Sequence, residues 1–316
     1  MSYTILSGGV GGAKLVAGFD ALISSAEVRV IANTADDFVH LGLNISPDID
    51  TLMYTLAGIA NPQTGWGILD ETFSCMSALD ELDGATWFRL GDKDLATHLH
   101  RTTMLQKGNS LSDVTAALCA ALEVQMPIIP MTNDLVATRV HTDDGVLDFQ
   151  DYFVRRQAQP AVKRLVYAGS DTAAIAPTAR DALLRDSLKA VVITPSNPYL
   201  SIDPILSIAG IREALRESKV PVIAVSPIVG GQALKGPTAK IMNELGLESS
   251  ALAIAKHYHG TIDGLVIDTT DSALQSSIEA LGIKVCVSNT VMTDLISKKD
   301  LAAAITDFAA NFEPNA

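Results

Sequence analysis

The sequence predicts an α/β fold, a Rossmann-like and mainly parallel sheet with helices on both faces, plus a largely helical insertion and an antiparallel hairpin. Short β-branched runs recur along the 316 residues and alternate with helix-like segments, which is typical of βαβ units. The runs are apolar and do not alternate, as expected for strands covered on both faces. Small, polar and acidic clusters follow the runs, and such turns mark the ligand-binding edge of an open α/β sheet.

Eight runs are expected to be strands, and they are, in chain order, 3–6, 27–32, 85–90, 163–168, 189–194, 220–226, 263–268 and 283–288. From about 51 to 125 the pattern is largely helical. Gly108 is expected to end one helix there, and Ser110 or Ser112 to cap the next. Residues 135–154 differ, because a DDG turn joins two partly alternating runs and predicts a hairpin. We therefore expect residues 1–316 to form a single α/β nucleotide-binding domain with a helical insertion at about 51–125.

Composition excludes several classes of protein. No apolar run approaches the roughly 18 to 20 residues that span a bilayer, and the chain begins with a strand and a glycine turn instead of a signal peptide. We expect a soluble, cytoplasmic protein. The net charge of −13 argues against binding to nucleic acid or to anionic membranes. Cys75, Cys119 and Cys286 match no zinc spacing and are expected to be reduced core thiols.

The stretch LSGGVGGAKL, residues 6–15, places Gly9, Gly11, Gly12 and Lys14 directly after the first strand. It lacks the third glycine of a dinucleotide fingerprint. It also lacks the glycine and the Ser or Thr of a P-loop, where it has Ala13 and Leu15. A glycine turn that leads into a helix near Ala13 would still present amides and a positive dipole end to a phosphate. The alternative is a purely structural tight turn.

Residues 33–51 concentrate four carboxylates, Asp36, Asp37, Asp48 and Asp50. Mg²⁺ is commonly held by one or two carboxylates together with substrate phosphates, so these side chains are candidate metal ligands. Asp36 and Asp48 alone would each be compatible with the capping of a turn. Asp36 or Asp37 would also suit the ribose of a nicotinamide nucleotide.

Polar groups of residues 87–101 include Arg89, Asp92, Asp94, His98 and Arg101. His98 and Arg101 are three residues apart and share one face of the expected helix. Taken alone, the pattern is more typical of a solvated helix face than of a site. No Ser or Cys partner is visible for His98, so a nucleophilic triad is not predicted.

Two further loops are expected at the same edge. The first contains Ser196, Asn197 and Pro198, whose polar groups could bind a nucleobase or a sugar on a loop that proline stiffens. The second contains Gly230, Gly231 and Lys235. Each could be a scaffold turn, but two glycine-rich turns with lysines on one edge favour a polyphosphate between them.

Several blocks together carry a family resemblance: SGGVGGAKL, NTADD, PDIDTLMYTLAG, GWG, LGDKDLATHLHRT, FQDYFV, PSNPYLSIDPIL and SPIVGGQALKGP. From about Ser7 to at least Lys240, the chain resembles the 2-phospho-L-lactate transferase family of coenzyme F420 biosynthesis, often called CofD or FbiA. The segment after Leu245 carries weaker signals. The resemblance implies a Rossmann-like fold with added helices, usually assembled as a homodimer.

The resemblance also implies a Mg²⁺-dependent phosphotransfer. The ribityl 5′-hydroxyl of Fo, a deazaflavin, attacks the phosphate of a guanosine diphospho adduct, and GMP leaves. The adduct carries a three-carbon acid of the 2-phospholactate, phosphoenolpyruvate or 3-phosphoglycerate type. By resemblance, Asp50 and Arg89 fall where the family contacts Fo, and Asp50 could also hold metal or orient the attacking hydroxyl. Asp50 and Asp37 are the expected catalytic carboxylates. The PSNP loop and the two glycine turns then hold the guanosine diphosphate.

A related branch provides the alternative. It shares the glycine-rich opening and the overall fold, but it binds UDP-sugars and acts as a regulatory protein without known transferase chemistry. The NTADD, PDID and LGDKDLATH blocks distinguish the transferases from that branch, and this sequence has all three. The sequence therefore favours the transferase.

Overall fold

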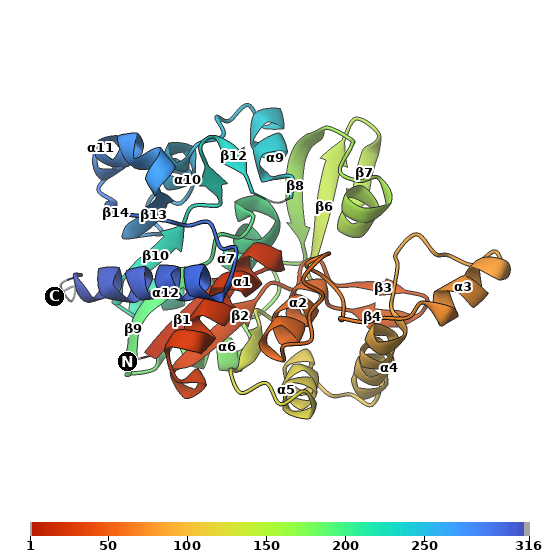
Figure 1. Cartoon of the computed structure of the whole chain (residues 1–316). Helices are drawn as coiled ribbons and strands as arrows, with labels where there is room; N and C mark the ends of the chain where they lie inside the picture. Colours follow the sequence, from red (N-terminus) through yellow and green to blue (C-terminus); the bar gives the residue numbers. More distant parts are fainter. Residues whose placement is uncertain (1, 235, 313–316) are drawn as a thin grey trace.

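A seven-stranded parallel sheet forms the centre of the computed structural model, which describes residues 2–234 and 236–312 (Figure 1). The strand order is β14-β13-β10-β9-β1-β2-β5, and every neighbouring pair is parallel. The bounds are β1 (Ser2–Ser7), β2 (Val28–Ala32), β5 (Ile128–Pro130), β9 (Leu188–Ile193), β10 (Val222–Val225), β13 (Gly264–Asp268) and β14 (Lys284–Ser288). Six of these seven strands match predicted runs.

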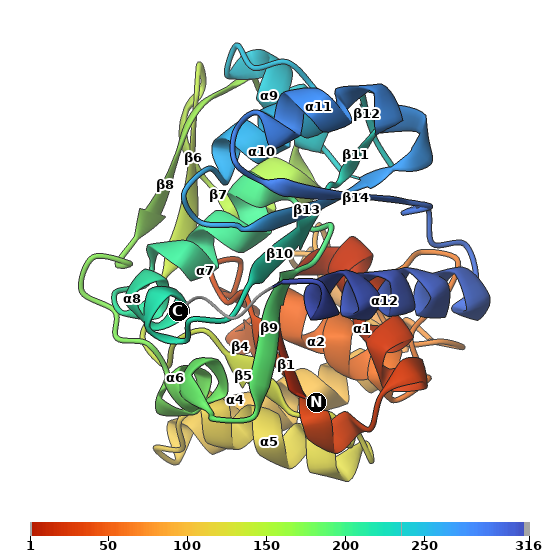
Figure 2. The same ribbon diagram turned by 90° about the vertical axis from the view of Figure 1, so that its left-hand side faces the viewer.

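Helices cover both faces of this sheet, as the sequence predicts (Figure 2). Against one face pack α1 (Gly9–Leu22), α2 (Pro47–Leu56), α5 (Leu111–Ala121) and α12 (Leu295–Ala310). Against the other pack α6 (Pro177–Leu184), α7 (Asp203–Ser207), α8 (Ile211–Glu217), α9 (Thr238–Glu244), α10 (Ala251–His257) and α11 (Gln275–Glu279). Short 3-10 and π segments complete the chain, namely η1 (Ser25–Glu27), η2 (Asp151–Arg155), η3 (Pro198–Ile202) and η4 (Thr269–Leu274).

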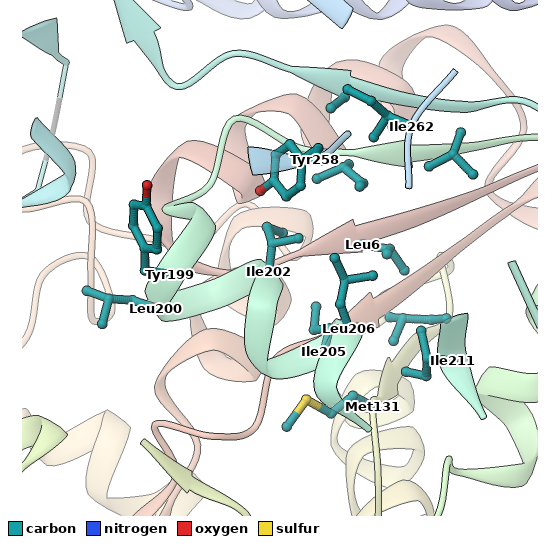
Figure 3. Close-up of a cluster of buried hydrophobic side chains, with 14 of the residues drawn as sticks. Leu6, Met131, Tyr199, Leu200, Ile202, Ile205, Leu206, Ile211, Tyr258 and Ile262 are labelled. Carbon is teal, nitrogen blue, oxygen red and sulfur yellow. The ribbon is translucent and has the colours of Figure 1, made fainter. Parts of the chain in front are cut away.

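Alternation along the strands divides the interior into two cores. In β1, Ile5 belongs to the core beneath α1, whereas its neighbour Leu6 belongs to the core on the opposite face, as the two-residue period of a strand requires. Figure 3 shows Leu6 with Ile202, Ile205 and Leu206 of η3 and α7. Burial on both faces explains why the predicted strands read as apolar runs.

The predicted hairpin at 135–154 is confirmed. It forms β6 (Ala137–Thr142) and β7 (Gly145–Asp148), and a third strand, β8 (Val162–Ala168), pairs antiparallel with β6. The run 163–168 is therefore a strand, but its assignment to the parallel sheet is wrong. Half-exposed residues along β8 distinguish it from the buried central strands.

The strand predicted at 85–90 is wrong, because these residues lie outside any strand. Its aromatic residues pack against a small hairpin, β3 (Phe38–His40) with β4 (Leu43–Ile45). The rings of Phe38 and Phe88 lie 4.8 Å apart at a steep angle, and Trp87 lies 5.1 Å from His40. The run thus serves side-chain packing and not backbone pairing.

The chain between β4 and β5 is mainly helical, as predicted. It contains α2, α3 (Ser74–Glu81), α4 (Asp92–Gln106) and α5, and in Figure 1 α3 lies at the far end of the β3–β4 hairpin. Gly108 follows α4 with a φ of 89°. Ser110 caps α5 through a reciprocal box with Asp113, which settles the choice between the two serines.

The cysteines fit the prediction only in part. Cys119 is buried and Cys286 is half-buried, but Cys75 is exposed, so its placement in the core was wrong. Among residues 2–234 and 236–312, no helix combines the length and the apolar character needed to cross a bilayer.

Candidate active site

The site lies where the connections of the sheet change direction. From β1 the chain runs outward through β2 to β5, then returns to β9 on the other side of β1 and continues outward to β14. Such a switch point leaves a crevice beyond the carboxyl ends of the two central strands. The loops at this crevice are the glycine turn after β1 and the TPSNP loop after β9. Polar clusters were expected after the strands, and six of them, SGGVGG, NTADD, TPSNP, SPIVGG, DTTD and SNT, do follow these parallel strands. A seventh expected cluster, GDKD, instead begins α4.

The helix after the glycine turn starts earlier than predicted, at Gly9 instead of near Ala13. Gly9 has a φ of 64°, a conformation that favours glycine. Gly11 and Gly12 are needed for close packing, since a Cβ on Gly11 would lie 2.9 Å from the Pro195 carbonyl oxygen and one on Gly12 would lie 2.6 Å from Ser196 Oγ. The glycines thus bring the amino end of α1 against the β9 loop, and amides of a first helical turn have no intrahelical acceptors.

The TPSNP loop is fastened to the glycine turn. Ser196 Oγ accepts a hydrogen bond from the Gly8 amide at 3.2 Å and donates to the Gly8 carbonyl at 2.5 Å. Asn197 Oδ1 accepts from the amides of Tyr199 and Leu200 at 3.0 and 3.1 Å, and Pro198 begins η3. Asn197 Nδ2 is buried without a hydrogen-bond partner among the described residues. Ser196 therefore links the two loops, while Asn197 retains a donor for a ligand.

The four predicted carboxylates come together beside these loops. Asp48 accepts from the Gly9 amide at 2.6 Å and from Asn33 Nδ2 at 2.9 Å, and the same Asn33 amide donates to Asp36. Asp36, Asp48 and Asp50 are all buried. Asn33, which follows β2 directly, was not among the predicted site residues, although its position at the end of a strand was a usable signal.

These acidic groups have too few compensating cations. Burial raises the pKa of Asp36 and Asp37 well above the usual carboxyl range, and for Asp36 repulsion from Asp48 adds to the effect. Burial likewise raises the pKa of Asp48 to about 6. Asp37 Oδ2 accepts from Ser46 Oγ at 2.7 Å, whereas Asp37 Oδ1 is buried and has no hydrogen-bond partner in the described part of the chain. Buried carboxylates that repel one another suit a divalent cation. Among residues 2–234 and 236–312, the group of three whose ligand atoms lie within 4.8 Å of one another is Asp50, Asp94 and His98.

The raised pKa of Asp48 predicts an unusual pH dependence of stability for the metal-free protein. Above about pH 6 the folded state must keep this carboxylate ionised, and that penalty disappears as the pH falls through 6. In EDTA, we expect the free energy of unfolding to rise by about 1 kcal/mol between pH 7.5 and 5.5. Asp48→Asn should remove part of this rise. Thermal unfolding measures both, and a wild type that loses stability over this range would contradict the prediction.

Asp50 has a different environment from the other three carboxylates. Arg101, which is fully buried, donates from both terminal nitrogens to the two oxygens of Asp50, with Nη1 to Oδ2 at 3.1 Å. His98 is also buried, with Nδ1 at 3.8 Å from Asp50 Oδ2. The interpretation of His98 and Arg101 as a solvated face was therefore wrong, because their partner lies on α2, which spacing within one helix does not reveal.

Arg89 lies on the surface, with its guanidinium 4.1 Å from the centroid of the Phe73 ring. Phe73 lines a pocket of about 270 Å³, together with Trp66 and other residues of the segment 61–71, and with Gly91 and Asp94 at the start of α4. Asp94 accepts from Tyr54 at 2.6 Å and lies 3.2 Å from His98 Nε2. The pocket is thus connected to Asp50 through buried side chains.

The second predicted glycine pair is the turn of a hairpin, β11 (Ile228–Val229) with β12 (Gln232–Ala233). Gly230 and Gly231 both have a positive φ, and the Gly230 amide donates to the Asp271 carboxylate at 3.1 Å. Lys235 lies outside the described residues. Lys14 is half-buried on α1 and donates to the Met292 carbonyl at 3.0 Å. The geometry therefore associates Gly9, Gly11, Gly12 and Asn197 with the acidic cluster most directly.

Comparison with known proteins gives consistent matches along the chain. The family model described as 2-phospho-L-lactate transferase CofD matches residues 4–308. A phosphoenolpyruvate transferase of Streptomyces griseus is 40% identical over 315 residues, covering 98% of each chain. A 2-phospho-L-lactate transferase of Methanocaldococcus jannaschii is 38% identical over 312 residues, again covering 98% of each chain.

Among solved structures, two crystal structures of one Bacillus halodurans protein share the fold. The first matches with a TM-score of 0.61 and 16% identity, covering 96% of this chain and 99% of that one. The second, titled as a member of the UPF0052 family, has the same TM-score at 15% identity and covers 96% and 98% of the two chains. At this identity the likeness concerns the fold alone.

Proposed function

This chain belongs to the 2-phospho-L-lactate transferase family of coenzyme F420 biosynthesis, and we propose that it transfers a phospho-three-carbon-acid group to Fo. The donor is the guanosine diphospho adduct of the acid, the acceptor is the ribityl 5′-hydroxyl of Fo, and GMP is released. The observation that carries this proposal is the position of the acidic cluster. It contacts the amide at the amino end of α1 through Asp48, which places an anion-binding element beside carboxylates that suit a cation.

The reaction requires one bond to form and one to break. The 5′-oxygen of Fo forms a bond to the phosphorus that carries the three-carbon acid, and the bridging bond to the α-phosphate breaks with its electron pair going to GMP. The hydroxyl proton needs an acceptor close to the attacking oxygen. Asp37 suits this role because its Oδ1 is unpartnered among the described residues. Asp50, held by Arg101, suits the orientation of the hydroxyl.

Mg²⁺ fits the residues present. Asp36 and Asp48 would hold it, and Asp50 is a further candidate, since these are oxygen ligands of the kind that Mg²⁺ prefers, which leaves Asp37 for the proton. When bound, the ion would neutralise charge on the diphosphate. The chain's own contribution to phosphoryl transfer is then mainly the positioning of both substrates.

On the donor side, we assign the diphosphate to the amino end of α1, with Gly9, Gly11 and Gly12 allowing close approach. Lys14 and Asn197 add polar groups, and Ser196 and Pro198 shape the loop. The hairpin turn at Gly230 and Gly231 is proposed as the far wall of the guanosine site, and Lys235 stays a sequence-based candidate for the phosphates. Relatives named for phosphoenolpyruvate are 39–41% identical to this chain and relatives named for 2-phospho-L-lactate 35–38%, so the acid carried by the donor is a question for assay.

On the acceptor side, we assign the deazaflavin ring to the pocket lined by Trp66 and Phe73. These aromatic rings could stack on the planar ring, and Arg89 lies at the edge of the pocket over Phe73. The pocket leads to Asp94 at the start of α4, so a ring bound there places the ribityl chain toward Asp50. On the basis of the family resemblance, we also propose that the protein is cytoplasmic and forms a homodimer.

Replacing Arg89 with alanine is expected to weaken the acceptor site only. We expect the KM for Fo to rise by about 5- to 20-fold, because a cation at the pocket edge is lost, with the affinity for GDP unchanged. Separate titrations of Fo and of GDP measure the two effects. A loss of GDP affinity with unchanged Fo binding would place Arg89 on the wrong side of the site.

The proposal is tested by ligand binding to the purified protein with Mg²⁺. The transferase assignment predicts saturable binding of both GDP and Fo, and no competition from UDP-glucose. The alternative, a regulatory UDP-sugar-binding protein, predicts tight UDP-glucose binding and none of Fo. Isothermal titration with the three ligands separates these outcomes.

A further inference from the structure

A chain of buried polar side chains connects α2 with α4 behind Asp50. Asp50 and Tyr54 are four residues apart on α2, and Asp94, His98 and Arg101 share one face of α4. The contacts run from Tyr54 to Asp94, from Asp94 to His98, from His98 to Arg101 and from Arg101 to Asp50. All five residues are at most 9% exposed.

The donors in this chain determine the position of the ring proton on His98. A guanidinium has only donors, so His98 Nδ1, which lies 3.0 Å from Arg101 Nη1, must accept. The ring proton therefore sits on Nε2, which lies 3.2 Å from Asp94 Oδ1 without making a well-directed hydrogen bond to any described residue. Asp94 in turn accepts from the Tyr54 hydroxyl. Hydrogen bonds thus orient Asp94 from Tyr54 and the guanidinium of Arg101 from His98, while Asp94 and His98 are in close contact.

The stability of the protein does not explain this arrangement. Burial of an arginine and a carboxylate is opposed by the loss of their hydration, and well-packed apolar residues often serve stability equally well. The pair does fix geometry, because Arg101 occupies one acceptor position on each Asp50 oxygen and a carboxylate has about four such positions. The remaining positions of Asp50 then face a defined direction.

We propose that Arg101 and His98 are positioning residues that hold Asp50 in its working orientation, anchored by Asp94 and Tyr54. This inference rests on the proposed function, in which Asp50 orients the attacking hydroxyl of Fo. The role of His98 is to keep the guanidinium plane aligned with Asp50 by accepting a hydrogen bond from Nη1. The structure therefore requires an acceptor at the place of Nδ1, and the volume of the ring is secondary.

Two substitutions at His98 separate these requirements. His98→Asn places an amide oxygen near the position of Nδ1 and keeps the acceptor for Arg101, although it is the smaller side chain. His98→Gln is closer to histidine in size, but it places its amide near Nε2 and loses that acceptor. The matched control is His100→Gln, which changes an exposed histidine on the same helix.

The test is steady-state transfer to Fo with the active guanosine adduct and Mg²⁺. We expect His98→Gln to lower kcat by about 10- to 100-fold, as loss of a residue that orients a ligand typically does, with the donor KM within about two-fold. His98→Asn should retain more of the wild-type kcat than His98→Gln, and His100→Gln should match the wild type. Any other ranking of the two His98 variants overturns the inference.

A further variant keeps the inference testable if both His98 variants fail to fold. Tyr54→Phe preserves the ring and removes only the hydroxyl that anchors Asp94. We expect kcat to fall by about 3- to 10-fold at an unchanged donor KM, and an unchanged kcat overturns the inference. A wild-type enzyme that shows no transfer overturns the proposed function and this inference with it. An active wild type in which the two His98 variants rank in the reverse order overturns the inference alone.

Discussion

Asp50→Asn is expected to lower kcat for transfer by about 10²- to 10⁴-fold, the range associated with loss of a positioned acid–base group. The asparagine keeps the shape of the side chain but replaces one acceptor oxygen with a donor that opposes Arg101. The attacking hydroxyl of Fo then loses the carboxylate that orients it. Steady-state kinetics with Fo and the guanosine adduct measure the effect.

Loss of stability must be separated from loss of catalysis in this variant. Removal of one partner from a buried ion pair typically lowers the free energy of unfolding by about 3–5 kcal/mol, so a fraction of the molecules could be unfolded. The control is the affinity for GDP, whose proposed site is the glycine turn, and it should stay within about two-fold of wild type in folded protein. A folded Asp50→Asn protein that transfers at the wild-type rate would remove Asp50 from the mechanism.

Removal of divalent metal is expected to reduce transfer by at least about 10³-fold. In the metal-free state, Asp36, Asp37 and Asp48 lie beside the proposed diphosphate site and repel the negatively charged diphosphate. A bound cation would offset this repulsion. Activity in EDTA and its recovery with Mg²⁺ give the measurement. Full activity in EDTA would contradict the assignment of the acidic cluster.

A pair of variants links this effect to the cluster. Asp36→Asn removes one buried carboxylate and should raise the Mg²⁺ concentration required for half-maximal activity by about 10-fold or more. Asp181→Asn changes an exposed carboxylate on α6 and should leave that concentration unchanged. Equal shifts in both variants would indicate a general effect of charge and not a site.

Local sequence predicted most of the sheet, because its central strands are continuous apolar runs that differ clearly from the segments around them. β5 was missed since it has only three residues, Ile128–Pro130, and its pairing with β2 is a tertiary contact. The aromatic run at 85–90 resembled a strand because the packing partners of Phe88 and Trp87 lie some fifty residues earlier, in β3. β8 was recognised as a strand, but its antiparallel pairing with β6 places it in a separate sheet.

The acidic cluster was predictable because its members lie within 15 residues, in the turn after β2 and on α2. The role of Arg101 was not, since it depends on the crossing of α4 and α2. The glycines of α1 illustrate both situations. Their abundance was visible in the sequence, whereas the closeness of Gly11 to Pro195 arises from a loop almost two hundred residues away.

The most direct test of the central claim is transfer by the purified protein. Fo and Mg²⁺ are supplied in parallel with the guanosine diphospho adducts of 2-phospholactate, phosphoenolpyruvate and 3-phosphoglycerate, and the products are identified by mass. The account predicts that one adduct yields phosphoester-linked Fo together with GMP, and that Asp50→Asn yields almost none. Silence with all three adducts, together with tight binding of UDP-glucose, would contradict it.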